Sequence, residues 1–180
     1  MESFAFEQEM SIIDKLYDKY NTFAETHSEK LPEAIYIKPI IRKVLIIIFF
    51  WGGGFRDWRP EQFYRQARYF ANHGMMAYTG EYRVKSRHDI TMFDCVKDAK
   101  SAIRFLKKNK DLLSIDSSRI IASGGSSGGM IAACTEFIDH VNDDQDDLSF
   151  TSRPNALILY NPPLNIIRYL IRPTFFQILN

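Results

Sequence analysis

The chain has 180 residues, of which 46% are hydrophobic and 14% aromatic, and its formal net charge is +1. This composition predicts one folded domain with a hydrophobic core and excludes a disordered chain. The near balance of 23 basic and 22 acidic residues argues against a nucleic-acid partner, because such partners require a basic face.

The hydrophobic pattern alternates between short apolar runs and longer amphipathic segments. The predicted elements, in chain order, are a helix over 7–25, a strand over 44–50, a helix over 60–72, a strand over 75–79, a helix over 91–110, a strand over 119–123, a helix over 127–139 and a strand over 156–160. The run at 44–50 (VLIIIFF) is continuously apolar, as expected of a strand buried on both faces. Strands separated by helices predict βαβ units, and therefore an α/β fold with a mostly parallel sheet and helices on both faces.

Three parts are expected along the chain. These are an N-terminal helical segment over 1–33, an α/β domain over 34–163, and an apolar tail over 164–180 that shows no clear periodicity. A sheet that ends with the strand at 156–160 leaves an uncovered edge, which predicts self-association through that edge unless the tail covers it.

The first ten residues and the apolar runs bear on the cellular location of the protein. Residues 1–10 carry no apolar signal-peptide core, and the longest apolar run is far too short to cross a bilayer, which together predict a soluble, cytoplasmic protein.

Cys95 and Cys134 lie among apolar neighbours in predicted helices, so we expect buried free thiols. The acidic run at 143–147 is expected to be a solvated loop, since it lacks the glycine and the terminal glutamate of a calcium loop.

The strongest motif is G-x-S-x-G at Gly124, Ser126 and Gly128, placed between a predicted strand and a predicted helix. A serine on such a sharp strand-to-helix turn has a strained backbone, and glycines beside it remove side-chain clashes. A second frame, Gly125-x-Ser127-x-Gly129, fits the same pattern. We prefer Ser126, because it follows the strand at the usual distance; the alternative without chemistry is an ordinary tight turn.

A second glycine-rich turn, Gly52 to Gly54, follows the strand at 44–50. Successive glycines expose backbone N–H groups to a substrate carbonyl, as an oxyanion hole requires. The alternative is a flexible strand-to-helix loop. A phosphate-binding loop fits neither turn, because the P-loop lysine and the G-x-G-x-x-G spacing are missing.

Taken as an ordered set, these motifs resemble the acetyl-esterase/lipase group of α/β-hydrolases, which includes BD-FAE-like (feruloyl-esterase-like) and hormone-sensitive-lipase-like carboxylesterases. The resemblance covers about 34–163 and is carried by FFWGGGF at 49–55, EYR at 81–83, DAKSAIRFL at 98–106, IDSSRI at 115–120, the elbow at 124–129 and SRPNALILYNP at 152–162. It implies an α/β-hydrolase fold whose C-terminal strands and helices lie beyond this chain. Trp51 stands where many relatives have histidine, which changes the pocket wall.

The resemblance also implies roles for individual residues. Ser126 would attack an ester carbonyl, and the backbone N–H groups of Gly53, Gly54 and Ser127 would hold the oxyanion. The reaction would pass through an acyl-enzyme formed from short acyl esters, with acetylated sugars as candidate substrates. Neither a metal nor an organic cofactor is implied.

The general base of a catalytic triad is harder to identify in the sequence than the nucleophile. In this fold the acid and the histidine follow the serine in sequence, and His140 is the only histidine that does so. A helix of about a dozen residues would carry His140 roughly 20 Å from Ser126, so we reject it as the base. His88 is expected to have a surface or capping role, the alternative being a place on the active-site rim, and His27 and His73 are expected to be exposed.

The missing base leaves two functional hypotheses from the sequence. The favoured one is an esterase fragment that holds the nucleophile and the oxyanion hole but not the whole triad. The alternative is a non-catalytic pseudo-hydrolase or ligand-binding module of the same fold. A nucleotide-binding α/β domain is a remote third.

Overall fold

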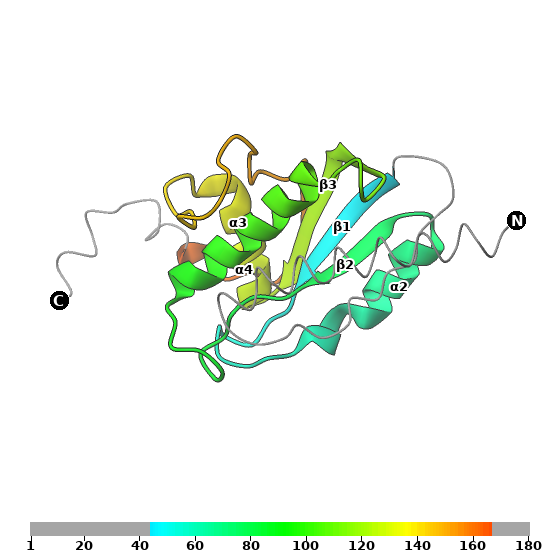
Figure 1. Cartoon of the computed structure of the whole chain (residues 1–180). Coiled ribbons are helices and arrows are strands. Elements are labelled where there is room, and N and C mark those ends of the chain that lie inside the picture. Colours follow the sequence, from blue (N-terminus) through cyan, green and yellow to red (C-terminus); the bar gives the residue numbers. More distant parts are fainter. Residues whose placement is uncertain (1–43, 167–180) are drawn as a thin grey trace, which may run out of the picture. The chain divides into compact units, whose positions relative to one another are not determined.

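Four parallel strands form one sheet in the order β2-β1-β3-β4 in the computed structural model, which describes residues 44–166 (Figure 1). The elements are β1 (Val44–Phe50), a 3₁₀ turn η1 (Pro60–Phe63), α2 (Tyr64–Asn72), β2 (Met76–Gly80), α3 (Met92–Lys108), β3 (Ile115–Gly125), α4 (Ser127–Phe137), β4 (Ala156–Tyr160) and a 3₁₀ turn η2 (Leu164–Ile166). The helix predicted over 7–25 and most of the tail predicted over 164–180 lie outside the described residues.

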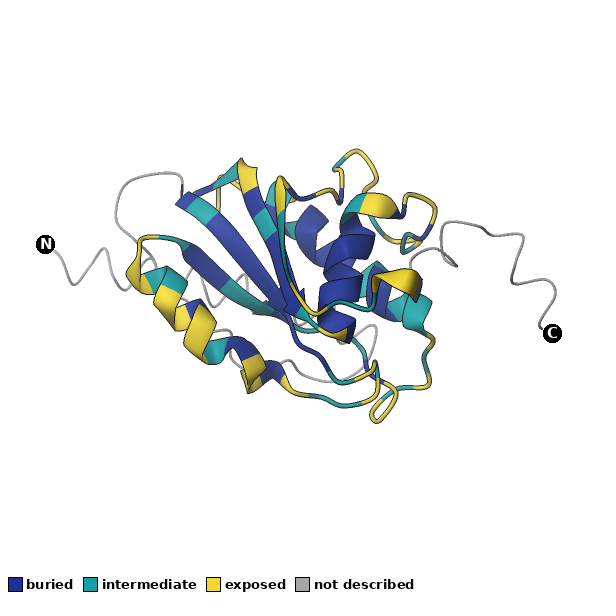
Figure 2. Cartoon of the chain, turned by 180° about the vertical axis from the view of Figure 1, so that it is seen from behind, coloured by how far each residue is buried: buried dark blue, intermediate teal, exposed yellow. Residues whose placement is uncertain are grey.

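The core lies around the two central strands. β1 pairs with β2 on one side and β3 on the other, and its residues are almost all buried, as its continuous apolar run predicts (Figure 2). The chain first steps from β1 to β2 and then crosses back to β3 and β4. Because such crossovers are right-handed, the reversal places α2 on one face of the sheet and α3 and α4 on the other.

The helices begin and end for local reasons. Thr91 and Asp94 form a capping box at the start of α3, and Thr91 N–H and Oγ1 each lie 2.8 Å from the Asp94 carboxylate. Helix α4 is buried on nearly all sides, as its apolar composition predicts. Beyond its end, the Lys100 ammonium donates to the carbonyls of Ile138 (2.6 Å) and Asp139 (3.2 Å).

Some predicted boundaries are wrong. The helix predicted over 60–72 begins as a 3₁₀ turn and becomes α-helical only at Tyr64. β3 begins at Ile115 and not at 119, because pairing with β1 continues across a bulge in which Asp116 accepts from the N–H and hydroxyl of Ser118. The polar residues Asp116, Ser117 and Ser118 are typical of a turn, so the sequence did not predict this pairing.

The acidic run at 143–147 is less solvated than expected. Asp146 is 2.6 Å from the Arg104 guanidinium, and both side chains are less than a tenth exposed. Arg104 also donates to Asn142 Oδ1 (2.6 Å) and to the Phe150 carbonyl (3.0 Å). The loop is therefore held against α3 by a buried ion pair, which its charge pattern alone did not indicate.

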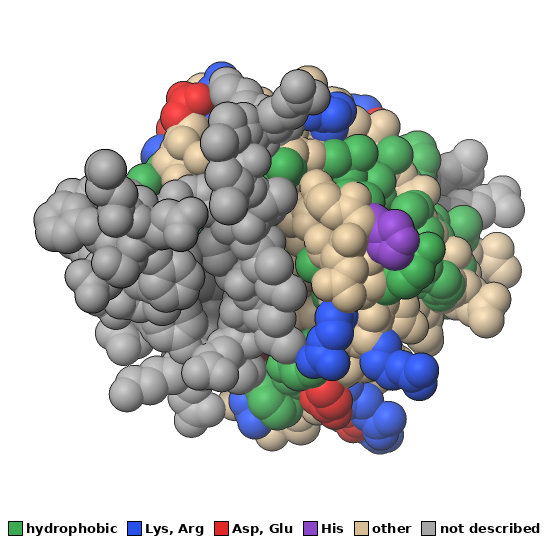
Figure 3. Space-filling model, turned by 90° about the vertical axis from the view of Figure 1, so that its right-hand side faces the viewer, with side chains coloured by type: hydrophobic (Ala, Val, Ile, Leu, Met, Phe, Trp, Pro, Cys, Tyr) green, Lys and Arg blue, Asp and Glu red, His purple; other side chains and the backbone are tan. Residues whose placement is uncertain are grey.

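The cysteines and the surface complete the description. Cys95 and Cys134 are buried free thiols, as predicted, and burial raises the pKa of each to about 12. The described atoms on the face in Figure 3 are mostly apolar or uncharged, with charges of both signs near the edge. None of the helices within 44–166 has the length and apolar run that crossing a bilayer requires.

The topology brings the chemically interesting loops together. In a parallel sheet all carboxyl ends lie at one edge, and ligands of open α/β sheets bind there. At this edge stand the glycine loop after β1, the loop that starts with Glu81 after β2, the elbow after β3 and Asn161 after β4.

Candidate active site

Ser126 lies at the turn between β3 and α4 in a strained conformation, with φ 51° and ψ −122°. Its N–H donates to the Tyr160 carbonyl (2.9 Å) at the end of β4, and its own carbonyl accepts from Met130 N–H (3.0 Å) in the first turn of α4. Ser126 is exposed, whereas Ser127 is only 2% exposed. Of the two overlapping motif frames, the geometry therefore favours the one centred on Ser126 as the serine that can meet a substrate.

The two motif glycines allow the close approach that this turn needs. A Cβ on Gly124 would lie 2.5 Å from the Gly128 carbonyl and 2.6 Å from that of Phe50. A Cβ on Gly128 would collide with the carbonyl oxygens of Phe50 and Trp51. The elbow and the end of β1 are thus packed backbone to backbone, which holds the glycine loop beside Ser126.

The amides of the glycine loop all have partners. Gly53 N–H and Gly54 N–H both donate to Ser127 Oγ, at 3.1 and 3.0 Å, and Gly52 N–H donates to the side-chain oxygen of Gln62 (2.5 Å). The structure therefore brings together the three residues predicted as oxyanion donors. The side chain of Ser127, and not only its backbone, lies at the centre of that group.

Aromatic side chains pack against the end of β1 and the glycine loop that follows it. Trp51 is 1% exposed and stacks on Tyr82 with a centroid separation of 4.5 Å, while the Tyr82 hydroxyl donates to the Trp51 carbonyl (2.7 Å). Burial raises the pKa of Tyr82, although a hydrogen bond with the Ser127 side chain opposes the shift. Trp51 is thus packed against Tyr82 and next to the glycine loop. Phe63 lies beside the elbow, because a Cβ on Gly125 would lie 3.1 Å from the Phe63 ring.

A carboxyl group is buried in the loop after β2. Glu81 Oε1 accepts from Trp58 Nε1 (2.6 Å), and the Arg87 guanidinium lies over the Trp58 ring at 3.9 Å from its centroid. Glu81 Oε2 is buried without a hydrogen-bond partner among residues 44–166. Burial raises the pKa of Glu81 from 4.5 to about 7, and the Trp58 hydrogen bond and the charge of Arg87 only partly oppose it.

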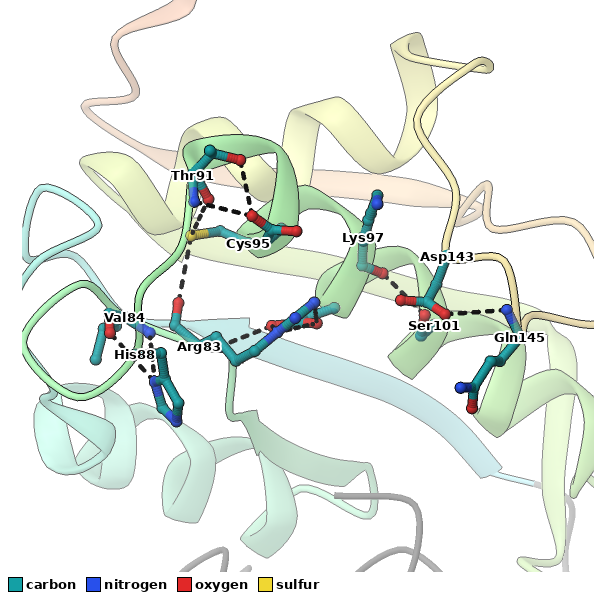
Figure 4. Close-up of polar contacts among 11 residues, drawn as sticks. Arg83, Val84, His88, Thr91, Cys95, Lys97, Ser101, Asp143 and Gln145 are labelled. Atoms are coloured by element: carbon teal, nitrogen blue, oxygen red, sulfur yellow. Dashed lines mark hydrogen bonds and ion pairs between the residues drawn. The ribbon is translucent and has the colours of Figure 1, made fainter. Parts of the chain in front are cut away.

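The same loop is tied to α3. Arg83 forms a two-pronged ion pair with Asp98, with nitrogen–oxygen distances of 2.7 to 3.0 Å, and its carbonyl lies 3.3 Å from Cys95 Sγ (Figure 4). His88 Nδ1 lies within hydrogen-bond distance of the N–H (3.3 Å) and the carbonyl (3.2 Å) of Val84 in this loop. These contacts fix the loop on the helix and leave His88 with a turn-forming role.

The other described histidines, His73 and His140, follow the ends of α2 and α4. His73 Nδ1 contacts the Tyr69 carbonyl (2.7 Å) at the end of α2. His140 is exposed and follows α4, whose 11 residues span about 16 Å at 1.5 Å per residue. In the described part of the chain, no histidine forms a hydrogen bond with Ser126. His27 lies outside the described residues.

Sequence reasoning missed several residues of this site. Tyr82 lies within the EYR segment that carried the resemblance, but nothing in its spacing predicted contact with the glycine loop. Gln62 and the Ser127 hydroxyl belong to segments that are remote in sequence from their amide partners. A signal for Glu81 was present, since it directly follows β2 at the carboxyl edge of the sheet, where ligands of α/β sheets bind.

Comparison with known proteins gives a family match and several similar solved structures. The sequence matches the BD-FAE family over residues 34–159. Esterase 2 of Thermogutta terrifontis phosphonylated by cyclosarin is 41% identical, with a TM-score of 0.69 and coverage of 72% of this chain and 50% of that one. Its butyrate-bound form is 42% identical, with a TM-score of 0.68 and coverages of 72% and 48%. Its propionate-bound form is 40% identical, with a TM-score of 0.72 and coverages of 81% and 55%. The chain thus spans about half the length of these esterases. No curated protein matches it.

Proposed function

The chain belongs to the BD-FAE family, and from this premise we propose that it is a serine ester hydrolase with Ser126 as its nucleophile. Its parallel sheet with flanking helices is that of the α/β-hydrolase esterases it resembles, which confirms the expected fold class for the part of the fold that the chain spans. The observation that carries the proposal is the strained, exposed Ser126 on the turn between β3 and α4.

The proposed reaction has two halves. Ser126 Oγ attacks the carbonyl carbon of the ester and loses its proton to a base, and the alkoxy group leaves with a proton as the alcohol. Water then hydrolyses the acyl-enzyme to a carboxylic acid and restores Ser126. Backbone N–H groups of Gly53, Gly54 and Ser127 stabilise the oxyanion in both halves. Since the described histidines do not reach Ser126, the base comes from outside residues 44–166.

Short acyl esters are the proposed substrates, with acetylated sugars among them. The support comes from the related esterase, of which structures with bound propionate and bound butyrate exist. That esterase is also phosphonylated by sarin and cyclosarin, reagents that modify an activated serine.

A fluorophosphonate tests this proposal directly. The purified chain is incubated with the reagent, its intact mass is measured, and the modified peptide is mapped. We expect one adduct on Ser126, loss of the adduct in Ser126→Ala, and retention in Ser123→Ala, where a buried core serine is changed in the same strand-to-elbow segment. An adduct that persists in Ser126→Ala would refute Ser126 as the nucleophile, and a folded sample without any adduct would mean that these 180 residues do not supply the base.

The same absence of a histidine at Ser126 favours one alternative, a non-catalytic module of this fold that binds an ester or a carboxylate without cleaving it. This alternative predicts saturable binding of butyrate together with no ester turnover and no phosphonylation. Turnover that disappears in Ser126→Ala would eliminate it.

The predictions on partners and location stay predictions. Within 44–166, β4 pairs with β3 alone, and Tyr160 at its end is 43% exposed, which supports self-association through this edge as part of the proposal. A lack of nucleic-acid partners is proposed from the near balance of acidic and basic residues.

A further inference from the structure

The hydroxyl of Ser127 lies among the amides assigned above to the oxyanion. Its Oγ accepts hydrogen bonds from Gly53 N–H (3.1 Å) and Gly54 N–H (3.0 Å). One side-chain oxygen therefore stands where two of the three proposed backbone donors meet, at distances typical of an oxyanion in such a site.

The loop does not need this hydroxyl to hold its shape. The Gly53 carbonyl accepts from Arg56 N–H and Asp57 N–H, both at 3.1 Å, and Trp51 Nε1 donates to the Asp57 carbonyl (3.2 Å). From the opposite side, Tyr82 binds the Trp51 carbonyl (2.7 Å). These bonds fix the peptide planes that carry the Gly54 N–H and the Gly52 N–H without Ser127, so the Gly54 donor keeps its direction when the hydroxyl is absent.

We propose that the Ser127 hydroxyl is a resident occupant of the oxyanion hole, and that a substrate or product oxygen must displace it in order to bind the Gly53 and Gly54 amides. The inference rests on the proposed function, since that function assigns these amides to the oxyanion. Ser127 is buried and fully hydrogen-bonded, with Tyr82 as its third partner, so displacement breaks existing bonds. Removing the hydroxyl therefore strengthens the binding of a competing oxygen.

The test is a titration with butyrate, a carboxylate that presents an anionic oxygen, monitored on the amide NMR resonances of Gly53 and Gly54 in the ¹⁵N-glycine-labelled full chain. Wild type, Ser127→Ala and Ser123→Ala are compared; the last removes a buried hydroxyl that donates to the Ile158 carbonyl (2.7 Å) and does not touch the loop. We expect butyrate to shift both resonances and to bind Ser127→Ala about 2- to 10-fold more tightly than wild type, the range for one hydrogen bond. Ser123→Ala should bind as wild type does.

Equal or weaker binding by Ser127→Ala overturns the inference, and so does a titration in which neither glycine resonance shifts in either protein. Fluorophosphonate labelling of wild type separates this failure from failure of the proposed function. If Ser126 is labelled but Ser127→Ala does not bind butyrate more tightly, the esterase proposal is retained and the inference about the Ser127 hydroxyl is rejected. If Ser127→Ala binds more tightly but Ser126 is not labelled, the inference is retained and catalysis by this chain is rejected.

Discussion

Glu81→Gln removes a charge that the fold holds in an unfavourable place. The carboxyl follows β2 at the carboxyl edge of the sheet, one oxygen is bound by Trp58, and the other is buried without a partner among residues 44–166. Burial raises its pKa from 4.5 to about 7. Between these pH values the folded protein retains a proton that the unfolded chain releases, so its stability falls as the pH rises through this window.

The magnitude follows from the same shift. At about 1.4 kcal/mol per pKa unit, the change corresponds to at most about 3 kcal/mol, and partial contact of the side chain with solvent reduces it to about 1 to 2 kcal/mol. Glutamine keeps an acceptor for Trp58 and does not ionise. The stability of Glu81→Gln relative to wild type should therefore increase by about 1 to 2 kcal/mol between pH 5 and pH 8.

Urea denaturation followed by far-UV circular dichroism at several pH values measures this difference. Trp58→Phe is the matched variant, because it removes the donor that lowers the pKa of Glu81 and should make the pH dependence of stability steeper than in wild type. A stability difference between Glu81→Gln and wild type that stays constant or shrinks from pH 5 to pH 8 would refute the reasoning about burial.

Two further predictions concern the packing of the site and the acidic loop. Gly128→Ala should destabilise the protein by at least about 3 kcal/mol in urea denaturation, because a Cβ there meets two backbone carbonyls, and this outweighs the gain of about 1 kcal/mol from alanine in a helix. Gly54→Ala is its control: φ is +62° but no atom lies within 4 Å of the new Cβ, so a loss of about 1 kcal/mol is expected, and equal losses for the two variants would contradict the clash. Arg104→Met should cost about 3 to 5 kcal/mol, because it leaves Asp146 charged and buried. Lys108→Met, at the exposed ion pair with Asp147 in the same acidic run, should leave the urea midpoint unchanged, and similar shifts for both variants would argue against a buried loop anchor.

The strands and the fold class were predictable because they depend on patterns within one segment. VLIIIFF and ALILY are apolar runs flanked by turn residues, and both strands have the predicted bounds. β3 was predicted too short, because its pairing with β1 extends through the polar residues 116–118, and a bulge of this kind is specified by the neighbouring strand. The buried Arg104–Asp146 pair was missed for a similar reason, since all of β3 and α4 separate the two partners in sequence.

The candidate site divides in the same way. Ser126 and its glycines could be identified because the elbow is local: strand, strained residue and helix are consecutive in sequence. The Ser127 hydroxyl and Gln62 accept from amides of the glycine loop, and Tyr82 donates to the Trp51 carbonyl, so their roles depend on how separate segments pack around the end of β1. The pKa of Glu81 likewise depends on the burial of its side chain in the fold, which no residue spacing expresses.

The strain at Ser126 has a consequence for how catalysis and binding can be separated. A non-glycine residue at φ 51° and ψ −122° persists only where its surroundings determine it, at an expense of about 1 to 3 kcal/mol. Within residues 44–166, the contacts that do so are the backbone packing of Gly128 on β1, the bond from Ser126 N–H to Tyr160, and the first turn of α4. The proposed nucleophile and oxyanion donors are therefore positioned by contacts that involve no described histidine. Butyrate binding at the glycine amides reports on the first property and phosphonylation of Ser126 on the second, so the two measurements can give different answers for the same folded chain.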